Sequence, residues 1–176
     1  MNDEQAVPIQ HFFALGDLSQ AGSRIEIVAD GDDLARVARW AGVDTVRAFG
    51  AQVELCRLSR TRFSFEAELE ADIVQSCVVT LDPVATHIAK RITRELHFSP
   101  LPRAEGGELT LSAGDEDVPE EIASLDYDLA APLLEEFLLA IDPYPRKQGV
   151  AFEPPGQPAE PPESPFAVLK RLNEPG

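Results

Sequence analysis

The stretch Arg62-Phe63-Ser64-Phe65-Glu66-Ala67-Glu68-Leu69-Glu70 decides the fold, because its apolar residues alternate strictly with charged or hydroxyl residues. Successive side chains of a β-strand point to opposite faces, so this pattern predicts a strand with one core face and one face in water. Glu66, Glu68 and Glu70 share the water face. Such a row is ordinarily the solvated side of a half-buried sheet, and a cation site is the alternative.

The segments around this stretch predict the rest of an antiparallel sheet. Residues 53–58 and 73–81 are its expected neighbours, because the gaps between them are far too short for crossover helices. Residues 87–98 fit either a helix or a strand, and their Thr/Ile content and the following Ser99-Pro100 favour a strand. Residues 9–29 predict one or two strands. We therefore expect a sheet of about five strands.

Two helices are predicted to cover this sheet. In the first, Gly31-Asp32-Asp33 supplies an N-cap, apolar residues recur at helical spacing, and Gly42 ends the helix. The second covers residues 129–141, with Pro132 in its first turn and an apolar face. An acidic stretch, residues 105–136, runs into this helix. It holds eleven acids and no base, which predicts an exposed loop that enters the helix. The fold class is therefore α+β, with both helices on one face.

Composition divides the chain into three parts. Residues 1–147 form the α+β domain, and residues 148–163 are rich in Pro, Gly and Glu, which predicts a flexible linker. Residues 164–176 form a C-terminal docking motif with a short amphipathic helix, which is too short to be stable alone. Its expected docking residues are Pro165, Phe166, Val168, Leu169 and Leu172. Docking on the same chain, docking on a partner and a frayed tail all remain open.

The charge of the chain limits the classes of partner that it is expected to bind. Its 176 residues include 31 Asp and Glu but only 15 Lys and Arg, giving a net charge of −16. This balance opposes nonspecific binding to a phosphate backbone and favours a basic protein partner. The chain lacks an apolar run of the roughly 18 residues that a membrane span needs, and its first residues lack the basic and apolar regions of a secretion signal. We expect a cytoplasmic protein without membrane contact.

The sequence contains no catalytic pattern. There is no GxSxG, glycine-rich phosphate loop, HExxH or zinc-spaced cysteine set. We therefore expect neither enzymatic activity nor a cofactor. Cys56 and Cys77 are expected to be reduced and buried as small hydrophobic residues.

The few basic residues of the domain fall into two groups. Arg57, Arg60 and Arg62 surround an expected hairpin, and Lys90, Arg91 and Arg94 lie on another expected strand. If the two groups lie side by side, these six residues form a candidate RNA-contact patch. The alternative is that they pair with the glutamate row across the strands.

Three segments of the chain resemble the YceD family, the large ribosomal RNA subunit accumulation proteins of bacteria and plastids. These segments are residues 75–84 (QSCVVTLDPV), 135–147 (EEFLLAIDPYPRK) and 164–172 (SPFAVLKRL). Cys77, Leu81 and Pro83 are the structural residues of the first. The resemblance implies a role in the synthesis, processing or stability of 23S rRNA, and hence in assembly of the 50S subunit, with no known catalytic activity.

The chain departs from this family in its cysteines. Many relatives carry CxxC at the strand of Cys77 and further cysteines near the carboxyl terminus, whereas here Thr80 stands in the second position and no cysteine follows Cys77. Two thiols do not make a four-ligand zinc site, so we predict no metal.

The sequence therefore predicts a non-enzymatic ribosome biogenesis factor. Its expected partners are components or assembly factors of the large subunit, in particular basic proteins, and the 23S rRNA precursor. The alternative function is an acidic holdase or adaptor that binds a basic ribosomal protein.

Overall fold

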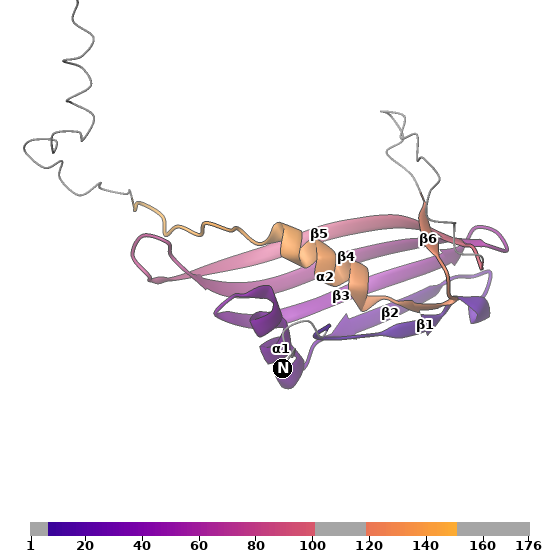
Figure 1. The fold of residues 1–176 in the computed structure, drawn as a ribbon, viewed down its shortest axis with the longest axis horizontal. Helices are drawn as coiled ribbons and strands as arrows, with labels where there is room; N and C mark the ends of the chain where they lie inside the picture. Colours follow the sequence, from indigo (N-terminus) through magenta and orange to yellow (C-terminus); the bar gives the residue numbers. More distant parts are fainter. Residues whose placement is uncertain (1–6, 101–118, 151–176) are drawn as a thin grey trace, which may run out of the picture.

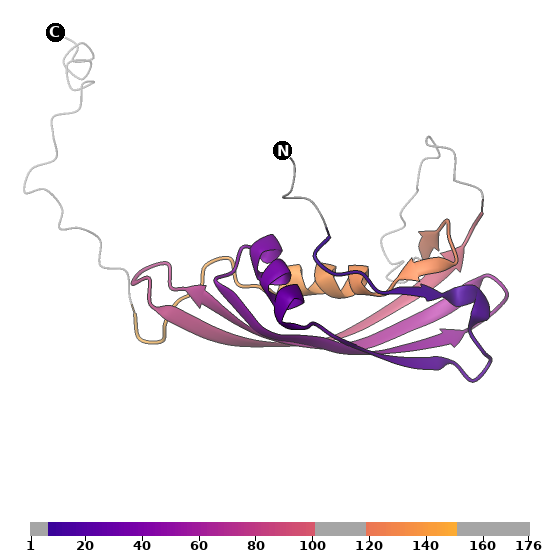
Figure 2. The ribbon, with the colours of Figure 1, turned by 90° about the horizontal axis from the view of Figure 1, so that it is seen from below.

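The computed structural model of the chain describes residues 7–100 and 119–150. They form an α+β fold in which a five-stranded sheet carries two helices, α1 and α2, on one face (Figures 1 and 2). The strand order is β2-β3-β4-β5-β6, and a separate pair is formed by β1 and β7. The strands are β1 Phe12–Ala14, β2 Ser23–Val28, β3 Thr45–Arg57, β4 Arg62–Ser76, β5 Pro83–Phe98, β6 Glu120–Ile122 and β7 Asp126–Asp128.

Strict alternation of side chains along β4 places the core on one side of the sheet. Phe63, Phe65 and Leu69 are buried, while the glutamates between them are exposed. On the buried side, the ring of Phe49 in β3 packs edge-on against Phe137 of α2, with 5.3 Å between ring centroids. The helices therefore cover only the apolar face, and we call the uncovered face the outer face.

Both predicted helices are present. α1 spans Gly31–Ala41 and ends at Gly42 in the left-handed conformation, as expected. Its N-cap, however, is Asp30, whose carboxylate accepts from the backbone N–H groups of Asp32 and Asp33, so the predicted cap was one residue late. α2 spans Ala130–Ala140, within one residue of the predicted limits at each end.

The predicted strand over residues 73–81 was wrong. Its first four residues continue β4, because the alternation of buried and exposed residues runs on without a break as far as Ile73. Residues 77–81 form the turn into β5, where Cys77 N–H donates to the Asp82 carbonyl at 2.8 Å. β5 confirms the choice of a strand for residues 87–98, and it begins earlier, at Pro83.

The acidic stretch also differs from its prediction as a loop. β6 pairs with the end of β5 in parallel, so the five-stranded sheet is not wholly antiparallel, and β7 pairs with β1. Three-residue strands lack a readable period, which is why charge alone suggested a loop. Residues 105–118 of this stretch, residues 151–163 of the predicted linker and the docking motif lie outside the described residues.

Gly22, which leads into β2, is expected to be intolerant of substitution. Its φ is +78°, and an added Cβ would lie 2.7 Å from the carbonyl oxygen of Leu55. Gly42 also has a positive φ, +68°, but nothing lies within 4 Å of its Cβ position. Gly42→Ala should therefore cost about 1 kcal/mol through backbone strain alone, and Gly22→Ala at least about twice as much. Urea unfolding of both variants measures the difference, and equal costs would contradict the close approach of Gly22 to β3.

Candidate functional site

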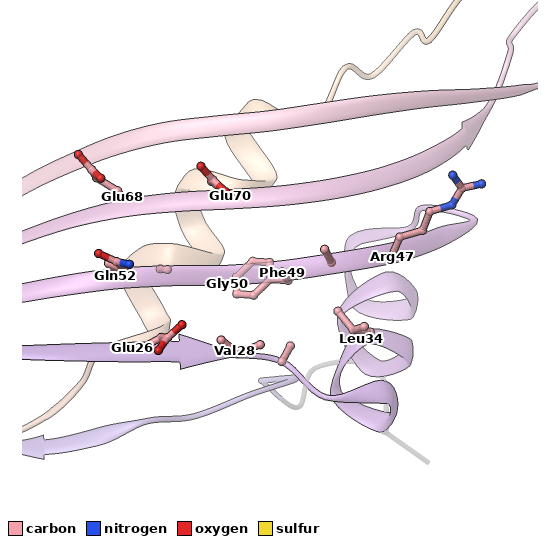
Figure 3. A pocket seen from close by; sticks show the side chains of 12 residues that line it. Glu26, Val28, Leu34, Arg47, Phe49, Gly50, Gln52, Glu68 and Glu70 are labelled. Atoms are coloured by element: carbon pink, nitrogen blue, oxygen red, sulfur yellow. The ribbon is translucent and has the colours of Figure 1, made fainter.

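The outer face of the sheet carries a groove lined by carboxylates (Figure 3). Strand register builds it from two adjacent rows across β2, β3 and β4. One row is Glu26, Gln52 and Glu68, and the other is Val28, Gly50 and Glu70. The groove encloses about 470 Å³, and we call it the carboxylate groove. Arg47 lies at its α1 end.

Gly50 opens the floor of this groove. It occupies the central position of its row, where any other residue would place a side chain on the outer face. An added Cβ would lie 3.2 Å from the carbonyl oxygen of Ile27 and 3.7 Å from a methyl carbon of Val28. Val28 is 68% exposed, so the floor is apolar while the rim is acidic.

Ion pairs divide the carboxylates of the outer face into two groups. Those with a cationic partner form the pairs Arg24–Glu54, Arg62–Glu95 and Arg91–Glu66, and Asp72 is held by a hydrogen bond with the His87 ring. Within the described parts of the chain, Glu26, Glu68 and Glu70 have no such partner. These three line the carboxylate groove together with Arg47, so the lining residues carry a net negative charge.

The six candidate RNA-contact residues are split between the two faces of the sheet. Arg62 and Arg91 point to the outer face, where they pair with Glu95 and Glu66. Arg57 points to the other face, and its guanidinium donates to the carbonyls of Leu15 and Gly16 at 3.1 and 2.7 Å. The structure does not bring the six residues together in one patch.

The other three candidate residues, Arg94, Lys90 and Arg60, also differ in their surroundings. Burial opposes the charge of Arg94, but its hydrogen bonds to Glu135 of α2 and Glu120 of β6 raise the pKa of the guanidinium above its usual value. This residue joins β5 to β6 and α2. Lys90 and Arg60 are exposed and have no ionic partner among residues 7–100 and 119–150. Pairing with the glutamate row, the alternative interpretation, therefore holds only for Arg91, which pairs with Glu66, whereas Arg62 and Arg94 pair with carboxylates outside that row.

Cys77 is enclosed by the turn between β4 and β5 and by the chain after α2. The thiol is buried, and its sulfur accepts from the backbone N–H of Lys147 at 3.4 Å. A hydrogen bond with the Thr80 side chain, assisted by that of Lys147 and by other backbone N–H groups, lowers the pKa of Cys77 to about 6. Cys56, in contrast, is exposed, so its predicted burial was wrong, because it lies on the polar face of β3.

The other two residues of this family-like segment shape the same turn. Leu81 has a φ of +61°, which is unusual for leucine, and its side chain is 77% exposed. Pro83 is the first residue of β5 and pairs in register with Ser76. Thr80, which stands where the second cysteine of a CxxC would lie, hydrogen-bonds the thiol instead of offering a second sulfur.

No cluster of three or more His, Cys, Asp or Glu placed to hold a metal is found in the described residues. Within the same residues, no helix is long and apolar enough to cross a membrane. The candidate docking residues from Pro165 to Leu172 lie outside the described part of the chain.

Comparison of the chain with protein-family models, curated proteins and solved structures gave no match.

Sequence reasoning found part of the carboxylate groove. The row Glu66, Glu68 and Glu70 was recognised, but Arg91 neutralises Glu66, and Glu26 from β2 takes its place in the groove. Only the register of β2 against β3 reveals this exchange. The isolated glycine in the β3 pattern, Gly50, was the available signal for an open floor.

The low pKa of Cys77 predicts a pH-dependent stability. An unfolded cysteine titrates near 8.5 and the folded thiol near 6, so the folded state binds fewer protons between these values. The stabilisation should be fully present above about pH 9 and lost as the pH falls through 6. The melting temperature should therefore rise from pH 6 to pH 9, and Cys77→Ser should abolish the rise. Cys56→Ser is the matched control, and an equal rise in both variants would contradict this environment for Cys77.

Proposed function

We propose that the protein is a non-enzymatic assembly factor of the large ribosomal subunit that binds a basic protein through the carboxylate groove. The observation that carries the proposal is the concentration of carboxylates without cationic partners, Glu26, Glu68 and Glu70, around an open apolar floor. In this role the protein acts in the cytoplasm and supports the accumulation of 23S rRNA. This function unites the ribosome biogenesis role with the acidic adaptor that was its alternative.

The groove fits the side chain of a lysine or arginine. The aliphatic stem of such a side chain packs on Val28 and the Cα of Gly50, and its charged head reaches the carboxylates of the rim. Each exposed ion pair contributes only about 0.2–1 kcal/mol, so binding requires several pairs made together. The resulting attraction accelerates association and weakens as salt rises.

A protein partner is better supported than direct contact with RNA. Binding to phosphates requires cations that are clustered and free to displace counterions. Arg62, Arg91 and Arg94 are held by carboxylates of the chain itself, and Arg57 is held by backbone carbonyls. A phosphate must displace these partners and approach an acidic surface.

The connection to the ribosome comes from the resemblance to the YceD family, which implies support of 23S rRNA. Proteins that bind rRNA carry many lysines and arginines for the same electrostatic reason. An acidic factor that shields such a protein before assembly prevents its nonspecific binding to RNA and hands it to the particle. The two lines of support, family resemblance and groove, thus lead to one function.

Neutralising the groove is expected to weaken binding of basic proteins of the large subunit. The triple variant Glu26→Gln, Glu68→Gln, Glu70→Gln should lose about tenfold in affinity, since three pairs contribute about 1–2 kcal/mol together. Proteins extracted from purified 50S subunits are the probe. The control changes three exposed carboxylates that do not line the groove, Asp17, Asp126 and Asp142, to asparagine and thus has the same net charge.

In cells, the groove variant should lower the ratio of 23S to 16S rRNA and reduce the 50S peak in sucrose gradients, whereas the control should not. Equal binding by both variants would show attraction by net charge alone. Salt-sensitive binding to 23S rRNA fragments that is lost on replacing Arg57, Arg60 and Arg62 by Ala would contradict the protein-binding mode and favour direct RNA contact.

A further inference from the structure

Exposed apolar side chains gather at one end of the domain. Nine large hydrophobic side chains are exposed in the described residues, and five of them belong to the turn before β5 and to the segment that begins in the last turn of α2. These five are Val78, Leu81, Leu138, Leu139 and Tyr144, and we call them the distal apolar patch. The most exposed are Leu139 at 80%, Leu81 at 77% and Tyr144 at 70%.

Hydrogen bonds join the two segments that carry the patch. Val78 N–H donates to the Pro145 carbonyl at 2.9 Å, and the Gln75 side chain donates to the Asp142 carbonyl at 3.0 Å. Beside them, the ammonium group of Lys147 pairs with Asp82 at 3.0 Å. The two segments are therefore fixed to one another at residues 142–147.

The chain leaves the described structure beside this patch. Val150 N–H donates to the Lys147 carbonyl at 3.3 Å, and Lys147 itself contacts the Cys77 turn. Figures 1 and 2 show residues 142–150 running along the turn between β4 and β5. Residues 151–163 separate this exit from the segment 164–172, and a flexible chain of that length spans about 20 Å.

The sequence of residues 164–172 is complementary to the patch. Phe166, Leu169 and Leu172 recur every three residues, so they form one stripe if the segment is helical. Lys170 and Arg171 give the segment a charge of +2. Because the whole chain has a net charge of −16, the rest of the chain carries −18. Apolar contact and charge therefore both favour binding to this acidic domain.

We propose that residues 164–172 dock on the distal apolar patch of their own domain as a short amphipathic helix. A linker of this length gives an effective concentration on the order of 1 mM, so the tethered segment outcompetes a second copy at ordinary protein concentrations. The docked segment covers apolar surface that otherwise invites association with other chains. This inference is independent of the carboxylate groove.

Disulfide trapping tests where the segment docks. In a Cys56→Ser, Cys77→Ser background, which removes both native thiols, Leu81→Cys with Leu169→Cys should form an intramolecular disulfide under mild oxidation. The control pairs Leu58→Cys with Leu169→Cys. Leu58 is an equally apolar, exposed residue in the turn between β3 and β4, at the opposite end of β4. The fifteen residues of β4 span about 50 Å, beyond the typical reach of the linker. We expect at least tenfold faster trapping for the Leu81 pair.

Hydrogen exchange of the full chain provides a second test that needs no change at the strained Leu81 position. Phe166→Asp with Leu169→Asp should speed amide exchange in residues 138–147 at least threefold and leave exchange in the centre of β4 unchanged. Equal trapping at both ends would overturn the proposal, as would trapping only as dimers. Unchanged exchange in residues 138–147 would overturn it as well, since a docked segment must protect the surface that it covers.

Discussion

The structure depends on the alternation of side chains along three long paired strands, β3, β4 and β5. Their register sets most of the buried residues opposite other buried residues, as in the pairs of Leu55 with Phe65 and of Ala67 with Ile92. The apolar face can then be covered by α1 and α2, while the glutamates of β4 point to the opposite face. A shift of one residue in any of these pairings would exchange the two faces, so the core and the carboxylate groove are consequences of one constraint.

This constraint explains which parts of the fold were predictable. The alternation in β4 and the apolar stripe of α2 are strong periodic signals, and both elements were correctly assigned. The boundary between β4 and β5 was not assigned correctly. Cys77, Val78 and Val79 are as apolar as the residues of a buried strand, although they form a turn. β6 and β7 are defined by pairing with distant segments, and local sequence carries no trace of that pairing.

The candidate site was predictable only where it follows one strand. The carboxylates of β4 could be placed on one face from their spacing, but the groove also needs Glu26 from β2 and the missing side chain of Gly50 in β3. Likewise, the six basic residues formed two groups in sequence, yet strand geometry sends Arg57 and Arg62 to opposite faces. Register across strands, which sequence does not specify directly, decides both outcomes.

Binding of a basic protein in the carboxylate groove is the central claim, and crosslinking from inside the groove tests it most directly. A photoreactive residue at position 52, between Glu26 and Glu68, should capture basic proteins of the large ribosomal subunit in living cells. The same residue at position 59, in the exposed turn between β3 and β4, should not capture them. Identical products from both positions, or crosslinks from position 52 to RNA alone, would contradict the account.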